Sequence, residues 1–129
     1  MSDAEVLGAW WRSMVDHARQ ATTVRALWFG LVELAEAEGA RWHLYVGGCR
    51  EFDREDDSCD WAAEPAWWPE ERYLFLAGLN DPAGNGAEAM LAHAADMVRS
   101  LAPEQSWPGL LEGVAVGFDD GDFVLTWTA

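Results

Sequence analysis

The stretch GVAVGFDDGDFVLTWT, residues 113–128, decides the fold class of this chain. Its side chains alternate in size and polarity over 113–118 and again over 123–128, which is the period of a β-strand. Between the two runs lies Asp119-Asp120-Gly121-Asp122, and Asp-Gly between alternating runs is a strong hairpin signal. The end of the chain is therefore predicted to form two adjacent antiparallel strands.

Upstream of this hairpin, the periodicity predicts three helices and two further strands. Apolar residues recur at helical spacing over 2–20, about 22–39 and about 86–101. Strand patterns cover 41–46, where Gly47-Gly48 is expected to end or bulge the strand, and 72–79. The second run is apolar on both sides, which predicts a central position in the sheet.

The element order ααββαββ predicts an α+β fold. We expect a four-stranded, mostly antiparallel sheet with helices packed on one face. The chain has 129 residues and shows no internal repeat or linker, so a single domain over 1–129 is expected.

The net charge restricts the classes of partner. The chain carries 23 acidic and 8 basic residues, all of them Arg, for a formal charge of −15. A nucleic-acid binder needs a basic face, and docking to an anionic membrane needs one too, so neither partner is expected. The sequence shows no apolar run of about 18 residues and no secretory signal, which predicts a cytoplasmic protein.

The negative charge is concentrated in two short stretches. Residues 51–71 hold nine acids and one Arg, and residues 119–122 hold three acids and no base. The first stretch falls in a run of 24 residues from Gly48 to Glu71, here called the acidic loop. It contains too many large rings for a solvated spacer, and loops of this length are usually functional or disordered. Those rings are Phe52, Trp61, Trp67 and Trp68.

Two interpretations of the acidic loop are compatible with each other. In the first, Trp61 and the Trp67-Trp68 pair fold back over the sheet, and the acids form the outer side of that cover. In the second, the loop is a recognition surface for a basic protein. Rings would then supply contact energy and carboxylates would supply steering and orientation.

A third interpretation of the loop is a calcium site. Asp53, Glu55, Asp57 and Glu64 fall at positions 1, 3, 5 and 12 of an EF-hand count. Ser58 stands at the position where the sharp turn needs glycine, and the flanks read as strands rather than helices. We therefore expect no bound metal.

Catalytic signatures are weak in this sequence. Cys49 and His43 are six residues apart, which is about 20 Å on an extended strand, and there is no Gly-x-Ser-x-Gly motif. Cys49 and Cys59 are expected to remain thiols in a reducing compartment, and the alternative is a disulfide that closes the loop. We expect a protein without catalytic activity and without a cofactor.

In size, acidity and architecture, the whole chain resembles the immunity proteins of bacterial polymorphic-toxin systems. The residues that carry the resemblance are Glu51-Phe52-Asp53-Arg54-Glu55-Asp56-Asp57 together with Trp61, Trp67 and Trp68. The resemblance implies a protein that binds the catalytic domain of a secreted toxin and covers its active site. The alternatives are a structural or regulatory homo-oligomer and a small enzyme of unknown chemistry.

The partner-binding residues follow from this interpretation. Carboxylates would steer a basic toxin or effector domain, and rings would slow its dissociation. The hairpin tip joins this surface only if it lies next to the acidic loop in space. The steering candidates are Glu51, Asp53, Glu55, Asp56, Asp57 and Asp60, then Asp119, Asp120 and Asp122; the ring candidates are Phe52, Trp61, Trp67 and Trp68.

Overall fold

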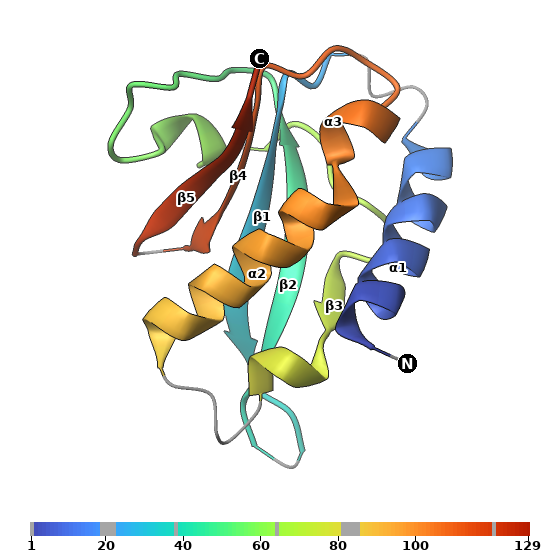
Figure 1. Cartoon of the computed structure of the whole chain (residues 1–129), viewed down its shortest axis with the longest axis vertical. Coiled ribbons are helices and arrows are strands. Elements are labelled where there is room, and N and C mark those ends of the chain that lie inside the picture. Colours follow the sequence, from blue (N-terminus) through green and yellow to red (C-terminus); the bar gives the residue numbers. More distant parts are fainter. Residues whose placement is uncertain (1, 19–22, 38, 64, 81–85, 120) are drawn as a thin grey trace.

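Five strands form one mixed sheet in the order β3-β2-β1-β4-β5, and the other elements are arranged around it (Figure 1). Figure 1 is a computed structural model of the chain, which describes residues 2–18, 23–37, 39–63, 65–80, 86–119 and 121–129. The elements are α1 (Asp3–His17), β1 (Ala26–Leu34), β2 (Arg41–Cys49), η1 (Asp60–Ala62), β3 (Tyr73–Phe75), η2 (Ala77–Asn80), α2 (Ala87–Leu101), α3 (Pro103–Ser106), β4 (Gly113–Phe118) and β5 (Phe123–Thr128).

The strand pairing confirms the C-terminal hairpin and makes the sheet mixed. β4 and β5 pair antiparallel, with the bounds that the alternating pattern predicts. β1 lies at the centre of the sheet, antiparallel to β2 and parallel to β4. The α+β class is therefore confirmed, but the sheet has five strands rather than the four expected.

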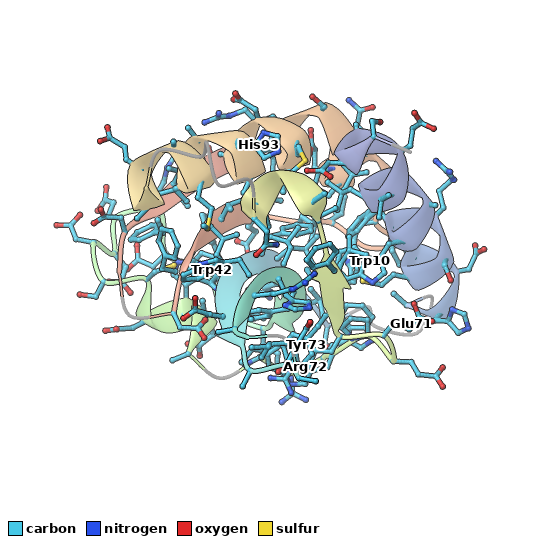
Figure 2. The ribbon with its side chains drawn as sticks, turned by 90° about the horizontal axis from the view of Figure 1, so that it is seen from below. Trp10, Trp42, Glu71, Arg72, Tyr73 and His93 are labelled. Atoms are coloured by element: carbon cyan, nitrogen blue, oxygen red, sulfur yellow. The ribbon has the colours of Figure 1, made fainter. Side chains whose placement is uncertain are left out.

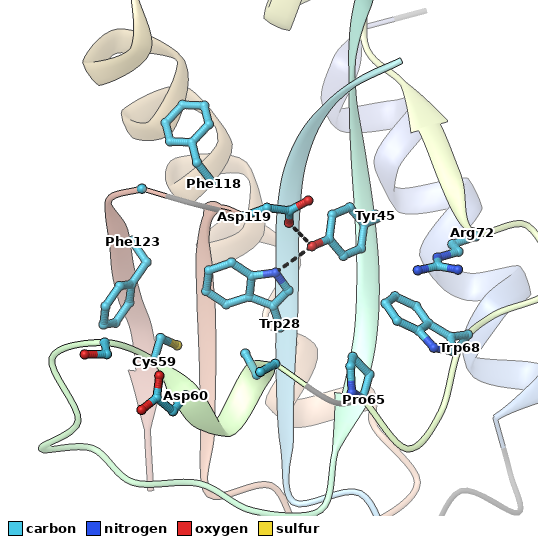
Figure 3. A pocket seen from close by; sticks show the side chains of 14 residues that line it. Trp28, Tyr45, Cys59, Asp60, Pro65, Trp68, Arg72, Phe118, Asp119 and Phe123 are labelled. Atoms are coloured by element: carbon cyan, nitrogen blue, oxygen red, sulfur yellow. Dashed lines mark hydrogen bonds between the residues drawn. The ribbon is translucent and has the colours of Figure 1, made fainter. Parts of the chain in front are cut away.

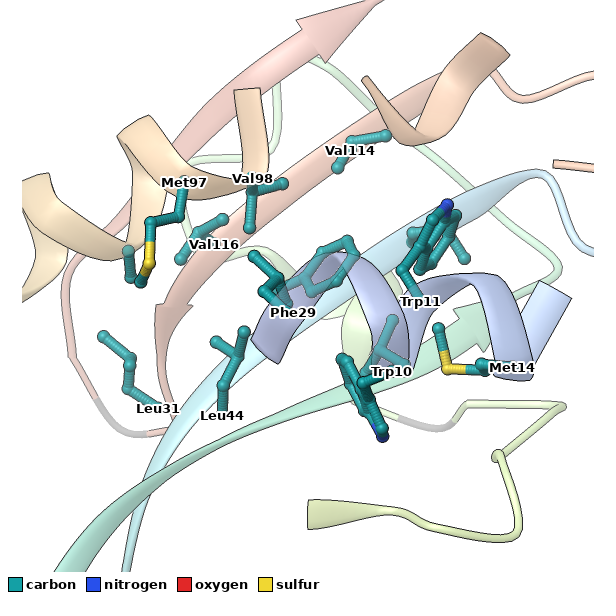
Figure 4. Close-up of a cluster of buried hydrophobic side chains, with 14 of the residues drawn as sticks. Trp10, Trp11, Met14, Phe29, Leu31, Leu44, Met97, Val98, Val114 and Val116 are labelled. Atoms are coloured by element: carbon teal, nitrogen blue, oxygen red, sulfur yellow. The ribbon is translucent and has the colours of Figure 1, made fainter. Parts of the chain in front are cut away.

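Helices α1 and α2 pack on one face of the sheet, as expected, and the largest core cluster lies beneath them (Figure 4). Trp11 of α1 contacts Phe29 of β1, with 5.8 Å between ring centroids. Val98 of α2 is fully buried, as is Val116 of β4. Among the described residues, no helix has both the length and the apolar character that a membrane span needs.

The predicted helix over 22–39 is wrong, because this segment contains strand β1. Leu27, Phe29 and Leu31 face the helices, whereas Ala26 and Trp28 belong to the cluster on the opposite face. A strand buried on both faces has no alternation between apolar and polar residues. Its continuous apolar run therefore also satisfies helical spacing.

The predicted central strand over 72–79 is also wrong. Only Tyr73–Phe75 forms a strand, and this strand lies at the edge of the sheet, after which the chain turns into η2 and buries Leu79. Tyr73 and Phe75 are 43% and 39% exposed, so the second apolar side is an open surface. Gly47-Gly48 does not end β2, because both glycines pair with β1.

Candidate functional site

The acidic loop covers the face of the sheet opposite the helices. Trp61 of η1 is 8% exposed and meets Trp28 of β1 edge-on, with 6.5 Å between ring centroids. Phe52 is half-buried and packs against Trp61 at 5.1 Å. These contacts support the first interpretation, in which the rings fold back over the sheet. Trp61 is buried and belongs to this cover, and its expected role in partner binding stays a prediction.

The two neighbouring tryptophans of the loop pack on different parts of the core. Trp67 contacts Trp107 on the helix side at 5.2 Å between ring centroids, and its backbone forms an antiparallel bridge with Gly48. Trp68 contacts Tyr45 on the opposite face at 5.8 Å. Both indoles are half-buried, and their contacts pack the end of the loop against the sheet.

Among the loop carboxylates that the structure describes, all are exposed except Asp56. The half-buried Asp56 accepts hydrogen bonds from the backbone N–H groups of Ser58 (2.9 Å) and Asp60 (2.8 Å), so it holds the loop in shape. Asp53 also accepts a hydrogen bond from the backbone N–H of Glu55 at 3.0 Å. The exposed loop carboxylates before η1 and at its start are Glu51, Asp53, Glu55, Asp57 and Asp60.

Two glycines in the sheet allow large rings to lie flat on this face. A Cβ atom on Gly30 would stand 2.1 Å from the Tyr45 ring, and one on Gly117 would stand 2.6 Å from Trp28. Both glycines are buried, and both lie on the same side of the sheet as the loop. The aromatic layer under the loop therefore depends on small residues in the central strands.

The tip of the β4–β5 hairpin meets the acidic loop around an open cavity of about 460 Å³ (Figure 3). Asp119 and Gly121 of the tip and Ser58, Asp60 and other loop residues line the same space. Residues of both acidic stretches of the sequence thus line one cavity in the fold. Asp122 is exposed on the same hairpin, and Asp120 lies outside the described residues.

A chain of hydrogen bonds crosses the floor of the cavity (Figure 3). The Trp28 indole N–H donates to the Tyr45 hydroxyl at 3.0 Å, and that hydroxyl donates to the Asp119 carboxylate. Burial and the bond to Asp119 raise the pKa of Tyr45 well above its usual range. Tyr45 therefore acts as a neutral donor that fixes the position of a carboxylate.

Arg72 also lines the cavity, where it lies on aromatic rings. Its guanidinium carbon lies 3.5 Å from the centroid of the Trp68 ring and 5.4 Å from that of Tyr73. Figure 2 shows Arg72 and Tyr73 on the side of the sheet away from the helices. The cavity lining therefore combines a cation on an aromatic face with the carboxylates of Asp60 and Asp119.

The two cysteines are free and buried, so the structure holds thiols rather than a disulfide. Burial raises the pKa of both thiols to about 12. His43 lies at the other end of the same continuous strand as Cys49, and its Nε2 is 3.2 Å from a Glu36 carboxylate oxygen. A Cys49–His43 dyad is not formed.

Among the described residues, the carboxylates of the EF-hand count do not form a metal-binding cluster. In the described part of the chain, no group of three or more His, Cys, Asp or Glu residues is placed to hold a metal ion. Glu64, the last position of the count, lies outside the described residues.

Sequence reasoning missed three residues that shape the cavity, namely Trp28, Tyr45 and Arg72. Trp28 falls in the segment predicted as a helix, and Tyr45 and Arg72 fall in predicted strands outside the acidic loop, so none of the three suggests a site. The signal that the sequence does contain is glycine within an apolar run, as at Gly30 and Gly117. Glycine inside a strand often marks a place where another group approaches the backbone closely.

Comparison of the chain with known protein families, curated proteins and solved structures finds no match.

Proposed function

We propose that this protein neutralises a basic toxin or effector domain by covering its active site with the acidic loop and the neighbouring hairpin tip. One observation carries the proposal: Asp60 of the loop and Asp119 of the tip line one cavity, although 59 positions separate them in sequence. Carboxylates from two segments then act on the same partner surface.

The charge distribution suits recognition of a cationic surface. Glu51, Asp53, Glu55, Asp57 and Asp60 of the loop are exposed, and the whole chain has a formal charge of −15. A concentrated field of one sign raises the association rate with an oppositely charged surface, and added salt suppresses this effect. The partner is therefore a protein with a basic active-site cleft.

The rings contribute to binding by holding the loop in place. Phe52 and Trp61 pack under the loop, and Asp56 ties its backbone together. A loop that is ordered before binding loses less conformational entropy when it meets its partner. We assign the direct contact with the partner to side chains that line the cavity, among them the half-buried Trp68, rather than to the buried Trp61.

The experiment is affinity capture from the organism that encodes the protein, at low ionic strength, followed by mass spectrometry. Three baits are compared: wild type, the loop variant Glu51→Gln/Glu55→Gln/Asp57→Asn, and the control Glu33→Gln/Glu88→Gln/Asp96→Asn. Both variants remove three negative charges, but the control residues lie outside the loop on β1 and α2. We expect one basic protein with wild type and control that is lost with the loop variant. Capture that is equal with all three baits would contradict the proposal.

A second candidate function, self-association, has one specific observation in its favour. Tyr73 and Phe75 are exposed on the edge strand β3, whose outer side has no neighbour in the sheet order. An edge strand with open rings can pair with a second copy. Light scattering separates the two candidates: a stable dimer that Tyr73→Ser/Phe75→Ser dissolves supports self-association.

A further inference from the structure

We propose that the cavity between the acidic loop and the hairpin tip receives one guanidinium or ammonium side chain of the basic partner. This inference rests on the proposed function and names the chemistry of its central contact. The cavity, at about 460 Å³, has room for a side chain together with part of its backbone, and residues of both acidic stretches line it.

The walls of the cavity suit a cation with an aliphatic stem. Trp28 and Phe123 lie 6.3 Å apart between ring centroids, and the Tyr45 ring continues the floor toward Trp68. Aromatic faces attract Arg and Lys through the ring quadrupole, and the stems of these residues pack on apolar surface. The protein already uses this chemistry once, because Arg72 stacks on Trp68 within the same lining.

The charges of the lining favour a positive ligand. Asp60 and Asp119 contribute two negative charges and Arg72 contributes one positive charge, which leaves the lining at −1. The hydroxyl of Tyr45 donates to one oxygen of Asp119, so the other carboxylate oxygen is oriented for a ligand. The backbone N–H of Asp60 donates to the Asp56 carboxylate at 2.8 Å, which fixes the backbone that carries the second carboxylate of the lining.

Two other ligand classes fit the lining less well. An anion would meet two carboxylates, those of Asp60 and Asp119, and Arg72 is the one cation among the lining residues that could attract it. A neutral polar ligand could stack on the rings, but it would not use the negative charge of the lining. The titration therefore includes an uncharged probe, whose binding would favour a neutral ligand.

The test titrates the whole protein with N-acetyl-arginine amide, N-acetyl-lysine amide and N-acetyl-citrulline amide. Citrulline has nearly the shape of arginine without its charge. Chemical shifts of the tryptophan indole N–H groups report binding, because Trp28 and Trp68 line the cavity. We expect saturable shifts with the two cationic probes at Trp28 and Trp68 and binding at least tenfold weaker with the citrulline probe. Equal binding of the neutral probe, or shifts that do not saturate, would overturn the proposal.

Matched variants separate a specific site from general attraction. Asp119→Asn removes one charge and keeps an acceptor for Tyr45, and Asp60→Asn provides a second variant. Asp57→Asn removes the same charge from a loop position that does not line the cavity. Loss of a hydrogen bond to a charged group predicts about tenfold weaker arginine binding for Asp119→Asn, with little change for Asp57→Asn. Equal weakening by both would overturn the proposal.

The outcomes also separate this inference from the proposed function. If the probes fail to bind while the loop variant still loses the basic partner, only the cavity proposal is wrong. If the probes bind as expected while capture is equal for all three baits, only the proposed neutralising function is wrong.

Discussion

The hydroxyl of Tyr45 donates a hydrogen bond to the carboxylate of Asp119, which joins strand β2 to the tip of the β4–β5 hairpin across 74 positions of sequence. The same hydroxyl accepts a hydrogen bond from Trp28. This contact ties the hairpin tip to the sheet, at the cavity that residues of both negatively charged segments line.

Tyr45→Phe is expected to lower the free energy of unfolding by about 1–3 kcal/mol, because it leaves the buried Trp28 N–H without its acceptor. Thermal and urea denaturation measure the change. Tyr73→Phe is the control, since Tyr73 lies exposed on the edge strand. If the two variants unfold alike, the hydrogen-bond chain does not stabilise the fold.

Gly30→Ala is expected to destabilise the protein by about 1–3 kcal/mol, because the added methyl group would overlap the Tyr45 ring. Gly8→Ala on helix α1 provides the contrast. There the nearest atom is the end of the flexible Arg12 side chain at 3.3 Å, and alanine favours a helix by about 0.5–1 kcal/mol. Equal effects at the two positions would argue against close packing of Tyr45 on Gly30.

The buried thiols predict a loss of stability at high pH. The pKa of Cys49 and Cys59 is about 12 in the folded protein against 9.0 for a free thiol, so the stabilising contribution is complete below pH 9. As the pH rises above 9, thiols of the unfolded chain lose protons while those of the folded chain keep them. Unfolding is therefore favoured by about 1 kcal/mol per thiol at pH 10.

Urea titrations at pH 8 and pH 10 measure this loss, and Cys59→Ala should reduce the difference between the two pH values. A difference that is unchanged in Cys59→Ala would show that this thiol titrates alike in the folded and unfolded chains.

Asp56→Ala is expected to loosen the acidic loop, because it removes the acceptor of the Ser58 and Asp60 backbone N–H groups. Hydrogen exchange of these two amides should accelerate by about fivefold, in line with a lost bond of about 1 kcal/mol. Asp57→Ala changes the same charge at an exposed neighbour and should leave both amides protected. Equal acceleration in both variants would mean that Asp56 does not order the loop.

Local patterns in the sequence predict the parts of the fold that local forces determine. Helices α1 and α2 follow their patterns because each has one buried and one exposed face. The β4–β5 hairpin follows its pattern because an Asp-Gly turn joins two short alternating runs. Strand β1 was misread because both of its faces are buried, so Leu27 and Trp28 are equally apolar. Edge strand β3 was misread because Tyr73 and Phe75 are apolar residues left in the open.

The candidate site could be predicted only in part, since its halves are distant in sequence. The concentration of acids in the loop and at the hairpin tip is visible without coordinates. That Asp60 and Asp119 share a cavity depends on the parallel pairing of β1 with β4, which no local pattern encodes. The same pairing brings Gly117 under Trp28 and so creates the floor of the cavity.

The central claim is that the acidic loop accelerates association with a basic partner. The most direct measurement is the association rate constant with the captured partner as a function of ionic strength, for wild type, the loop variant and the control variant. We predict a steep fall in wild type and control with added salt, and a slower, flatter dependence in the loop variant. Three identical rate constants with identical salt dependence would contradict the claim.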